Sequence, residues 1–336
     1  MKLISIIFFV FQLFLHSYSA YANSPAELAD FSKHGRLSVE AQHIVSENGQ
    51  PVILRGGALM DLLQYTYTGQ MIDYLHDSKA NVIRIPLNWG RGGINGSYEA
   101  HMQRFYRFVD YSLSKGLYVI ADFHAVSDPE QFGLQEMARR FFQDVAKRYG
   151  SSGQLIYEIF NEPTGKSAYS NEISWKSIKE YSETMIDVIR AIDPDAFIIV
   201  PTPIWSSAIN VPLLDPIKRS NIAYAYHFYA SLHLFQNRNY EIATQIPIIV
   251  TEWAAQTPEN SDGSINFKSL QQYIDWMNDA DISWMAWSYS DEQQPYGWFF
   301  PGAMADGRFE DKELRRWGRM VRDLLDDGLL NQSFSW

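Results

Sequence analysis

The stretch LIYEIFNEP, residues 155–163, decides how this chain folds. Its apolar part is typical of a short buried strand, and the strand is followed at once by Glu162. A second run, IIVTEW at residues 248–253, has the same form and delivers Glu252 at its end. A carboxylate beside an apolar strand is costly unless it is paired or used. The two runs therefore predict parallel strands whose C-terminal ends open onto one functional face.

Around these two runs, short apolar strands alternate with amphipathic helices. Strands that lack a polar face require a sheet covered on both sides, and eight of them can close a barrel. The sequence predicts a single-domain α/β TIM (β/α)8 barrel with a short N-terminal β-hairpin at residues 36–45. The predicted strands are 52–56, 82–86, 117–122, 155–160, 197–200, 222–226, 248–251 and 283–287. The predicted helices are 68–79, 98–115, 135–149, 174–192, 267–280 and 312–325.

Composition narrows the range of partners. The chain has 336 residues and a net charge of -11, which argues against a nucleic acid or an anionic membrane and makes a neutral polymer the easier substrate. Aromatic residues make up 15% of the chain and include 10 Trp, which suit both a core and stacking platforms for sugar rings. The absence of Cys excludes a disulfide framework and a thiolate zinc site.

Residues 1–22 are typical of a secretory signal peptide. Lys2 precedes the apolar run Leu3–Leu15, and Ala20-Tyr21-Ala22 forms a small-x-small cleavage site before Asn23. An uncleaved anchor is the alternative, but the run is shorter than the roughly 20 residues that span a bilayer. We expect residues 23–336 to form the barrel of a secreted protein, extracellular or periplasmic, that is monomeric and not membrane-bound after cleavage.

Two carboxylates at one barrel face suit cleavage of a glycosidic bond. One must protonate the leaving oxygen while the other attacks or stabilises the sugar carbon. The plainer alternative is two surface glutamates. Other polar or aromatic residues also lie at strand ends. Each of them alone could have a purely structural role, as a core histidine, a buried ion pair or a core aromatic. Their common position at one end of the barrel favours a site instead. They are Arg84, His124, Asn161, His227, Tyr229 and Trp287.

From about residue 35 to 291 the chain resembles glycoside hydrolase family 5, the cellulase-type retaining glycosidases. The strongest match is Asn161-Glu162-Pro163, and an ordered set of shorter motifs supports it. These are Val82-Ile83-Arg84, Asp122-Phe123-His124, His227-Phe228-Tyr229, Thr251-Glu252-Trp253 and Trp287-Ser288-Tyr289-Ser290-Asp291.

The resemblance implies that Glu162 is the acid/base and Glu252 the nucleophile. It implies that Asn161 holds the sugar 2-hydroxyl, an interaction that strengthens in the transition state. Arg84 and Tyr229 would hydrogen-bond Glu252 and keep it ionised and aimed. No metal or other cofactor is part of this mechanism.

The resemblance also implies substrate contacts. His124 and His227 would contact sugar hydroxyls and order the acid/base pair, and Trp287 would form the floor under the sugar being cleaved. The bacterial endoglucanase branch is the most similar one, which makes Tyr65 a substrate-binding residue and Trp205 a platform on the leaving-group side. The motifs that carry this are Leu54-Arg55-Gly56, Gln64-Tyr65 and Thr202-Pro203-Ile204-Trp205-Ser206.

The chain departs from that branch at two points. Leu59-Met60-Asp61 stands where the branch has a His, and Glu292 stands where it has a Lys. The expected activity is a secreted endo-β-1,4-glucanase acting on a β-linked polysaccharide or oligosaccharide. Related β-glycanases acting on mannan, xyloglucan or mixed-linkage glucan remain alternatives, as does a catalytically silent carbohydrate-binding barrel. A metal hydrolase would need ligands drawn from His124, His227, Asp122 and Glu252, without any His-x-His or His-Glu-x-x-His spacing.

Overall fold

Eight parallel strands close a barrel in the computed structural model, which describes residues 26–60, 62, 69–88, 97–131, 133–165, 174–256 and 264–330. Each barrel strand pairs with its neighbours in chain order, so the predicted TIM barrel is confirmed. The barrel strands are β5 (Arg55–Leu59), β6 (Val82–Asn88), β7 (Tyr118–His124), β9 (Leu155–Glu158), β11 (Phe197–Val200), β12 (Ile222–Tyr229), β13 (Ile248–Ala254) and β14 (Ser283–Tyr289).

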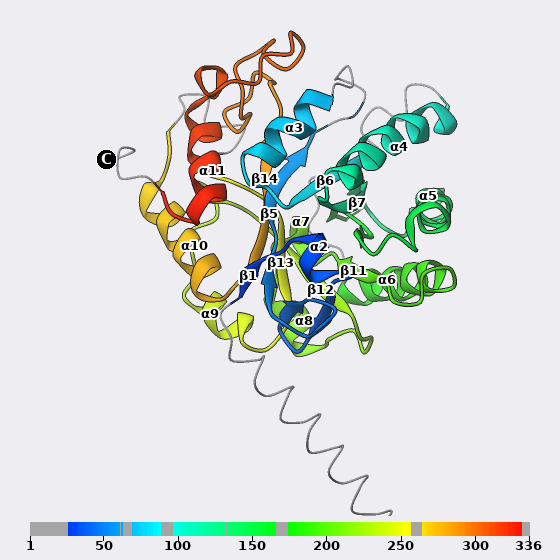
Figure 1. Ribbon diagram of the computed structural model, residues 1–336. Coiled ribbons are helices and arrows are strands. Elements are labelled where there is room, and N and C mark those ends of the chain that lie inside the picture. Colours follow the sequence, from blue (N-terminus) through cyan, green and yellow to red (C-terminus); the bar gives the residue numbers. More distant parts are fainter. Residues whose placement is uncertain are drawn as a thin grey trace, which may run out of the picture.

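Helices surround the barrel (Figure 1). They cover the outer faces of the strands, so that a strand such as β13 is buried along its whole length and needs no polar face. The sequence pattern of α5 explains its orientation, since Ala138, Phe141, Phe142 and Val145 recur at helical spacing and are buried. The helices are α3 (Gly69–Asp77), α4 (Tyr98–Ser114), α5 (Leu134–Tyr149), α6 (Trp175–Arg190), α7 (Pro203–Ser206), α8 (Asn210–Leu214), α9 (Arg238–Ala243), α10 (Phe267–Asp279) and α11 (Arg316–Asp327).

The N-terminal segment closes the end of the barrel where the strands begin. Arg36 binds the Asp193 carboxylate at 3.0 Å, and the Val39 amide donates to the Asn221 side chain, just before β12. This segment contains β1 (Glu27–Leu28), α2 (Phe31–His34), the predicted hairpin of β2 (Ser38–Glu40) and β3 (His43–Val45), and β4 (Val52–Ile53).

Two elements begin three or four residues later than predicted, and the predicted ends of several others differ from those observed. The first strand was expected at residues 52–56, but Val52 and Ile53 pair with β1, and the barrel strand begins at Arg55. The last helix was expected from residue 312, but a 3-10 turn, η1 (Asp311–Glu313), comes first. Arg315 then donates to the carbonyls of Phe299 and Gln294, which delays α11 to residue 316.

Residues 1–22 and Tyr65 lie outside the described part of the chain. Within the described part, every helix is too short or too polar to cross a bilayer.

Candidate active site

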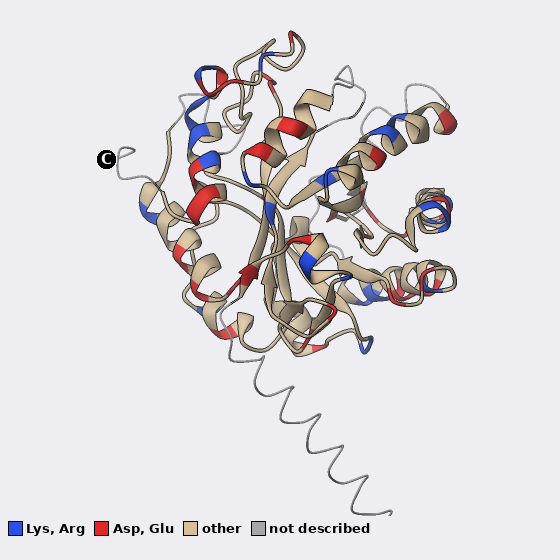
Figure 2. Ribbon diagram, viewed as in Figure 1, with Lys and Arg blue, Asp and Glu red and all other residues tan. Residues whose placement is uncertain are grey.

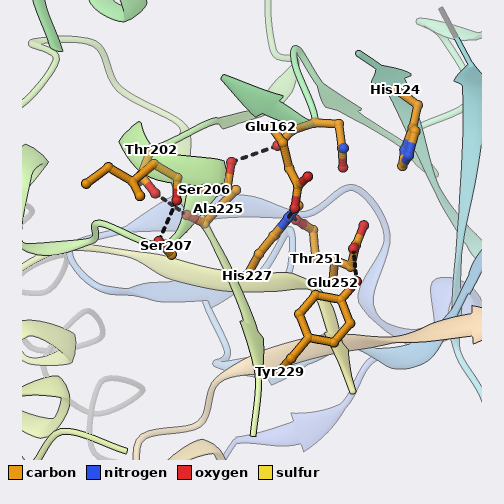
Figure 3. A network of polar contacts seen from close by, with 12 residues as sticks. His124, Glu162, Thr202, Ser206, Ser207, Ala225, His227, Tyr229, Thr251 and Glu252 are labelled. Atoms are coloured by element: carbon orange, nitrogen blue, oxygen red, sulfur yellow. Dashed lines mark hydrogen bonds and ion pairs between the residues drawn. The ribbon is translucent and has the colours of Figure 1, made fainter. Parts of the chain in front are cut away.

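The residues singled out from the sequence converge at the C-terminal end of the barrel, apart from Tyr65, which lies outside the described part of the chain. Glu162 opens β10 (Glu162–Pro163), which pairs with β8 (Val126–Ser127) and continues the wall beyond β7 and β9. Figure 3 shows Glu162 and Glu252 facing each other with His227 and Tyr229 beside them. Trp205 lies in α7, directly after β11.

Glu252 on β13 is held by two hydrogen bonds. The Tyr229 hydroxyl donates to its Oε1 at 2.6 Å, and a terminal nitrogen of Arg84 donates to its Oε2 at 3.3 Å. The side chain is nearly buried, with 4% of the residue exposed. Both oxygens are thus oriented before any substrate binds.

Arg84 sits at the centre of the site with no exposed surface. Besides Glu252, it donates to Glu158 at 2.6 Å and to the Asn161 side-chain oxygen at 2.6 Å, and it forms an ion pair with Asp122 at 3.0 Å. Burial by itself lowers the pKa of Arg84, but three carboxylates outweigh burial and raise it; they belong to Asp122, Glu158 and Glu252. The arginine therefore stays charged and ties four strand ends together.

Glu162 has a different environment from Glu252. His227 contacts its Oε1 through Nδ1 at 3.0 Å, and the other ring nitrogen contacts the Thr251 hydroxyl at 2.8 Å. Burial lowers the pKa of His227, but Glu158 and Glu162 outweigh burial and raise it to about 9. A charged His227 donates to both partners, which fixes the orientation of Glu162.

The rings of His124 and Trp287 stack against each other. Their rings are nearly parallel, with centroids 5.6 Å apart and an interplanar angle of 7°. His124 Nδ1 contacts the Asp122 carboxylate at 2.6 Å, which sets the ring orientation. Burial raises the pKa of Asp122, and the charge of Arg84 opposes that rise.

The turn that carries Asn161 and Glu162 is braced from α7. The Ser206 hydroxyl donates to the Asn161 backbone carbonyl at 2.7 Å, and the Glu162 amide donates to the Ala125 carbonyl at 3.0 Å. Trp205 and its neighbours Ile204 and Ser206 all have positive φ, between 53° and 58°. Such a run of non-glycine residues is strained and persists only where the surroundings hold it.

Sequence reasoning missed Glu158 as a functional residue. This buried carboxylate binds the Nε of Arg84 and lies 3.8 Å from His227, too far for a hydrogen bond but close enough for an ion pair. Burial raises its pKa, but Arg84 and His227 outweigh burial and lower it to about 2. The signal was present, because an acid inside an apolar strand requires a cationic partner. Sequence reasoning also missed Asp122 and Thr251 as positioning residues. Asp122 orients His124, and Thr251 contacts His227.

The site could offer donor atoms to a cation. One atom each of Glu162, His227 and Glu252 lie within 4.8 Å of one another. Both oxygens of Glu252 already accept hydrogen bonds, however, and both nitrogens of His227 are engaged. The positive charge of Arg84 would also repel a metal ion, so this donor set does not suit one.

The spacing of the two glutamates determines the available chemistry. A carboxylate oxygen of Glu162 lies within 4.8 Å of one of Glu252. Retaining glycosidases hold the two carboxyl groups about 5 to 5.5 Å apart, whereas inverting ones need roughly 6.5 to 9.5 Å to admit a water. The arrangement can accommodate one glycosidic bond between an attacking carboxylate and a proton donor.

Comparison with known proteins agrees with this geometry. The model of the family described as Cellulase (glycosyl hydrolase family 5) matches residues 45–293. Endoglucanase E-5 of Thermobifida fusca is 34% identical over 307 residues, which cover 87% of this chain and 64% of that protein. An endoglucanase of Clostridium saccharobutylicum is 32% identical over 303 residues, covering 88% of this chain and 66% of that protein. The chain thus spans about two thirds of the length of these relatives.

A solved structure is also similar to this chain. The catalytic domain of Thermobifida fusca endoglucanase Cel5A, in complex with cellotetraose, superposes with a TM-score of 0.81 at 32% identity. The match covers 88% of this chain and 99% of that domain.

Proposed function

This chain belongs to glycosyl hydrolase family 5, and on that premise we propose that it hydrolyses internal β-1,4 linkages of a glucan with retention of anomeric configuration. The observation that carries the proposal is the opposed pair Glu162 and Glu252, each held by different partners, with one oxygen of each lying within 4.8 Å of the other. The endoglucanase names of relatives that are 34% and 32% identical support the substrate class.

In the proposed first step, a Glu252 oxygen attacks the anomeric carbon while Glu162 gives its proton to the departing glycosidic oxygen. The bond to the leaving sugar breaks as the bond to Glu252 forms. In the second step Glu162 takes a proton from water, the resulting oxygen attacks the anomeric carbon, and Glu252 leaves. Arg84 and Tyr229 aim the nucleophile in both steps.

Substrate positioning follows from the remaining residues. The side chain of Asn161, held by Arg84, would meet the 2-hydroxyl of the sugar being cleaved. Trp287, stacked against His124, would form the floor under that sugar. We place the leaving sugar against Trp205. The cellotetraose bound by the Thermobifida fusca domain supports a cleft that accepts β-glucan oligosaccharides.

The signal-like segment 1–22 supports export of the protein, extracellular or periplasmic, with residues 23–336 as the mature chain.

The proposed substrate is tested by offering the purified protein equal masses of barley β-glucan, carboxymethylcellulose, glucomannan, xyloglucan and xylan. We expect the glucans to be cleaved first, with oligosaccharides of mixed length appearing early because cleavage is internal. Release of only mono- or disaccharide, or a preference for glucomannan or xylan, would contradict the proposal.

A further inference from the structure

Two adjoining hollows lie in the helical layer, beside the loop that follows β12. One, of about 700 Å³, lies between α9 and the start of α10; the other, of about 430 Å³, lies between the segment after α7 and α9. They share Leu234, Gln236 and Arg238, and neither contains Glu162 or Glu252. Their volumes fall in the range of small-molecule sites, about 300 to 1,000 Å³.

The lining of these hollows is cationic in a chain whose net charge is -11. Arg238 and Lys268 line the larger hollow, and no Asp or Glu among the described residues lines either one. Neither Arg238 nor Lys268 forms an ion pair with another described residue. Acidic and basic residues are otherwise interspersed along the outer helices (Figure 2). Two cations that no carboxylate neutralises, lying next to amide side chains, can bind an anionic group.

A buried amide in the smaller hollow lacks a partner. Asn239 lines this hollow and is 3% exposed, and its Nδ2 has no hydrogen bond to any described residue. The nearby Tyr226 hydroxyl pairs instead with the Tyr273 hydroxyl at 3.0 Å. Burial raises the pKa of Tyr226, and the Asn239 amide opposes that rise without reaching hydrogen-bond geometry. A buried donor without a partner destabilises the fold, and a ligand oxygen that accepts from it would remove this cost.

The rest of the lining suits a sugar ring. Leu234, 59% exposed, and Phe235 offer apolar surface to the C–H face of a pyranose. Amide side chains also line the larger hollow and offer hydrogen-bonding groups of the kind that bind sugar hydroxyls; they belong to Gln236, Asn237, Asn266 and Gln272. We propose that the two hollows form an accessory glycan site for a sugar that carries a carboxylate, a uronate residue. Arg238 and Lys268 bind the carboxylate, and the Asn239 amide donates to an oxygen of the ligand.

The position of this site connects it to the cleft, and in this respect the inference rests on the proposed function. Ser207 lines the smaller hollow and follows Ser206, which donates to the Asn161 carbonyl. Figure 3 shows Ser206 beside Glu162, with Ser207 farther from the glutamate. On the opposite wall, His233 accepts a hydrogen bond from the Tyr229 amide at 3.0 Å. An acidic strand or branch held here therefore keeps a mixed glycan next to the catalytic glutamates.

Binding is tested with two ligands that differ only in their carboxylates, cellotetraose and β-1,4-linked tetraglucuronate. Titration calorimetry on the full chain carrying Glu252→Ala separates binding from hydrolysis. In that background, Arg238→Gln with Lys268→Gln should weaken tetraglucuronate binding about tenfold or more, because charge-assisted hydrogen bonds are lost, and should leave cellotetraose binding unchanged. The matched control is Arg107→Gln with Lys218→Gln, two exposed cations that line neither hollow.

Asn239→Ala provides a second variant. Its thermal midpoint should equal or exceed that of the parent, because the amide it removes is unpaired, while tetraglucuronate binding should fall. Three results would overturn the uronate site. The Arg238/Lys268 variant could bind tetraglucuronate as tightly as the parent, or the Arg107/Lys218 control could lose as much affinity. Inorganic phosphate could also bind as tightly as tetraglucuronate. Barley β-glucan hydrolysis by the active protein is measured separately, so absence of cleavage would count against the proposed function alone.

Discussion

At the scale of single residues, one guanidinium organises the centre of the site. Arg84 contacts Asp122, Glu158, Asn161 and Glu252, which belong to different strands or strand ends. A buried charge of this kind is stable only when it is fully paired, and removing one partner of such a pair costs about 3 to 5 kcal/mol. The strands are therefore held in the arrangement that aims Glu252.

The roles of the two glutamates can be separated by their response to the leaving group. Glu252→Ala should lose several orders of magnitude in kcat on every substrate, because the nucleophile is gone. Glu162→Ala should be slow on polysaccharide but much less impaired on an aryl glycoside with a good leaving group, which needs no proton. Azide should accelerate that variant further and yield a β-glycosyl azide.

Proton NMR of the first-formed products checks the stereochemistry. The β-anomer is expected, because two displacements restore the starting configuration. If the α-anomer appears first, Glu252 does not act as a nucleophile.

The pH dependence of stability tests His227. Its pKa is about 9 in the folded protein, above the ordinary value of about 6.5. The group thus adds stability that is fully present below about pH 6.5 and is lost as the pH rises through about 9. The unfolding free energy should fall across this window by up to about 3 kcal/mol. Urea unfolding at several pH values measures this fall, and His227→Gln should remove most of it. Equal slopes in both proteins would show that His227 is not charged in the fold.

At the scale of elements, the α7 turn connects a strained backbone to the cleft. Ile204, Trp205 and Ser206 adopt positive φ, and the Ser206 hydroxyl holds the turn against the Asn161 carbonyl. Strain of this kind is typical of functional segments, where the surrounding contacts hold it in place. The conformation presents the partly exposed Trp205 beside the residues that follow β9.

Trp205→Ala should weaken cleavage of oligosaccharides more than cleavage of an activated aryl glycoside. Stacking on the leaving-group side lowers the barrier only for a substrate that has sugars there. The comparison of kcat/KM on cellotetraose and on an aryl cellobioside measures this difference. Trp205→Phe is the control, since a ring is retained. Equal losses on both substrates would assign Trp205 to packing.

The contact between β5 and β6 depends on one glycine. A Cβ at Gly56 would lie 1.8 Å from the Val82 carbonyl oxygen, which is backbone and cannot move aside. Gly56→Ala should therefore cost about 3 kcal/mol or more of unfolding free energy. Gly116→Ala is the control, because its Cβ would meet open space and only its φ of +80° carries a penalty, about 1 to 2 kcal/mol. Thermal unfolding of both variants should rank them in this order.

At the scale of the whole molecule, we expect stability and activity to require neither a disulfide nor a metal ion. The chain contains no cysteine, so reductant should leave the thermal midpoint unchanged. EDTA should leave the hydrolysis rate unchanged, because the donor atoms of Glu252 and His227 are engaged by protein groups. Loss of activity in EDTA that a divalent ion restores would remove the proposed mechanism.

The sequence by itself determined the barrel and the end of it that carries the chemistry. Strand and helix periods are local, so runs such as Leu155–Phe160 and Ile248–Val250 identify buried strands without any structure. An acid directly after such a run predicts the functional face, and Glu162 and Glu252 were singled out in this way. Boundaries that depend on distant partners were missed, as at Val52, which pairs with β1.

Only the tertiary structure decided which side chains meet. The partnership of Glu158 with Arg84 and the distance between Glu162 and Glu252 both join segments far apart in the chain. The folded chain also leaves the Asn239 amide nitrogen without a partner among the described residues. The positive φ of Ile204 goes against the preference of a β-branched residue and persists because Ser206 is tied to Asn161. Local sequence encodes elements, whereas barrel closure and strand register determine the distances on which the chemistry depends.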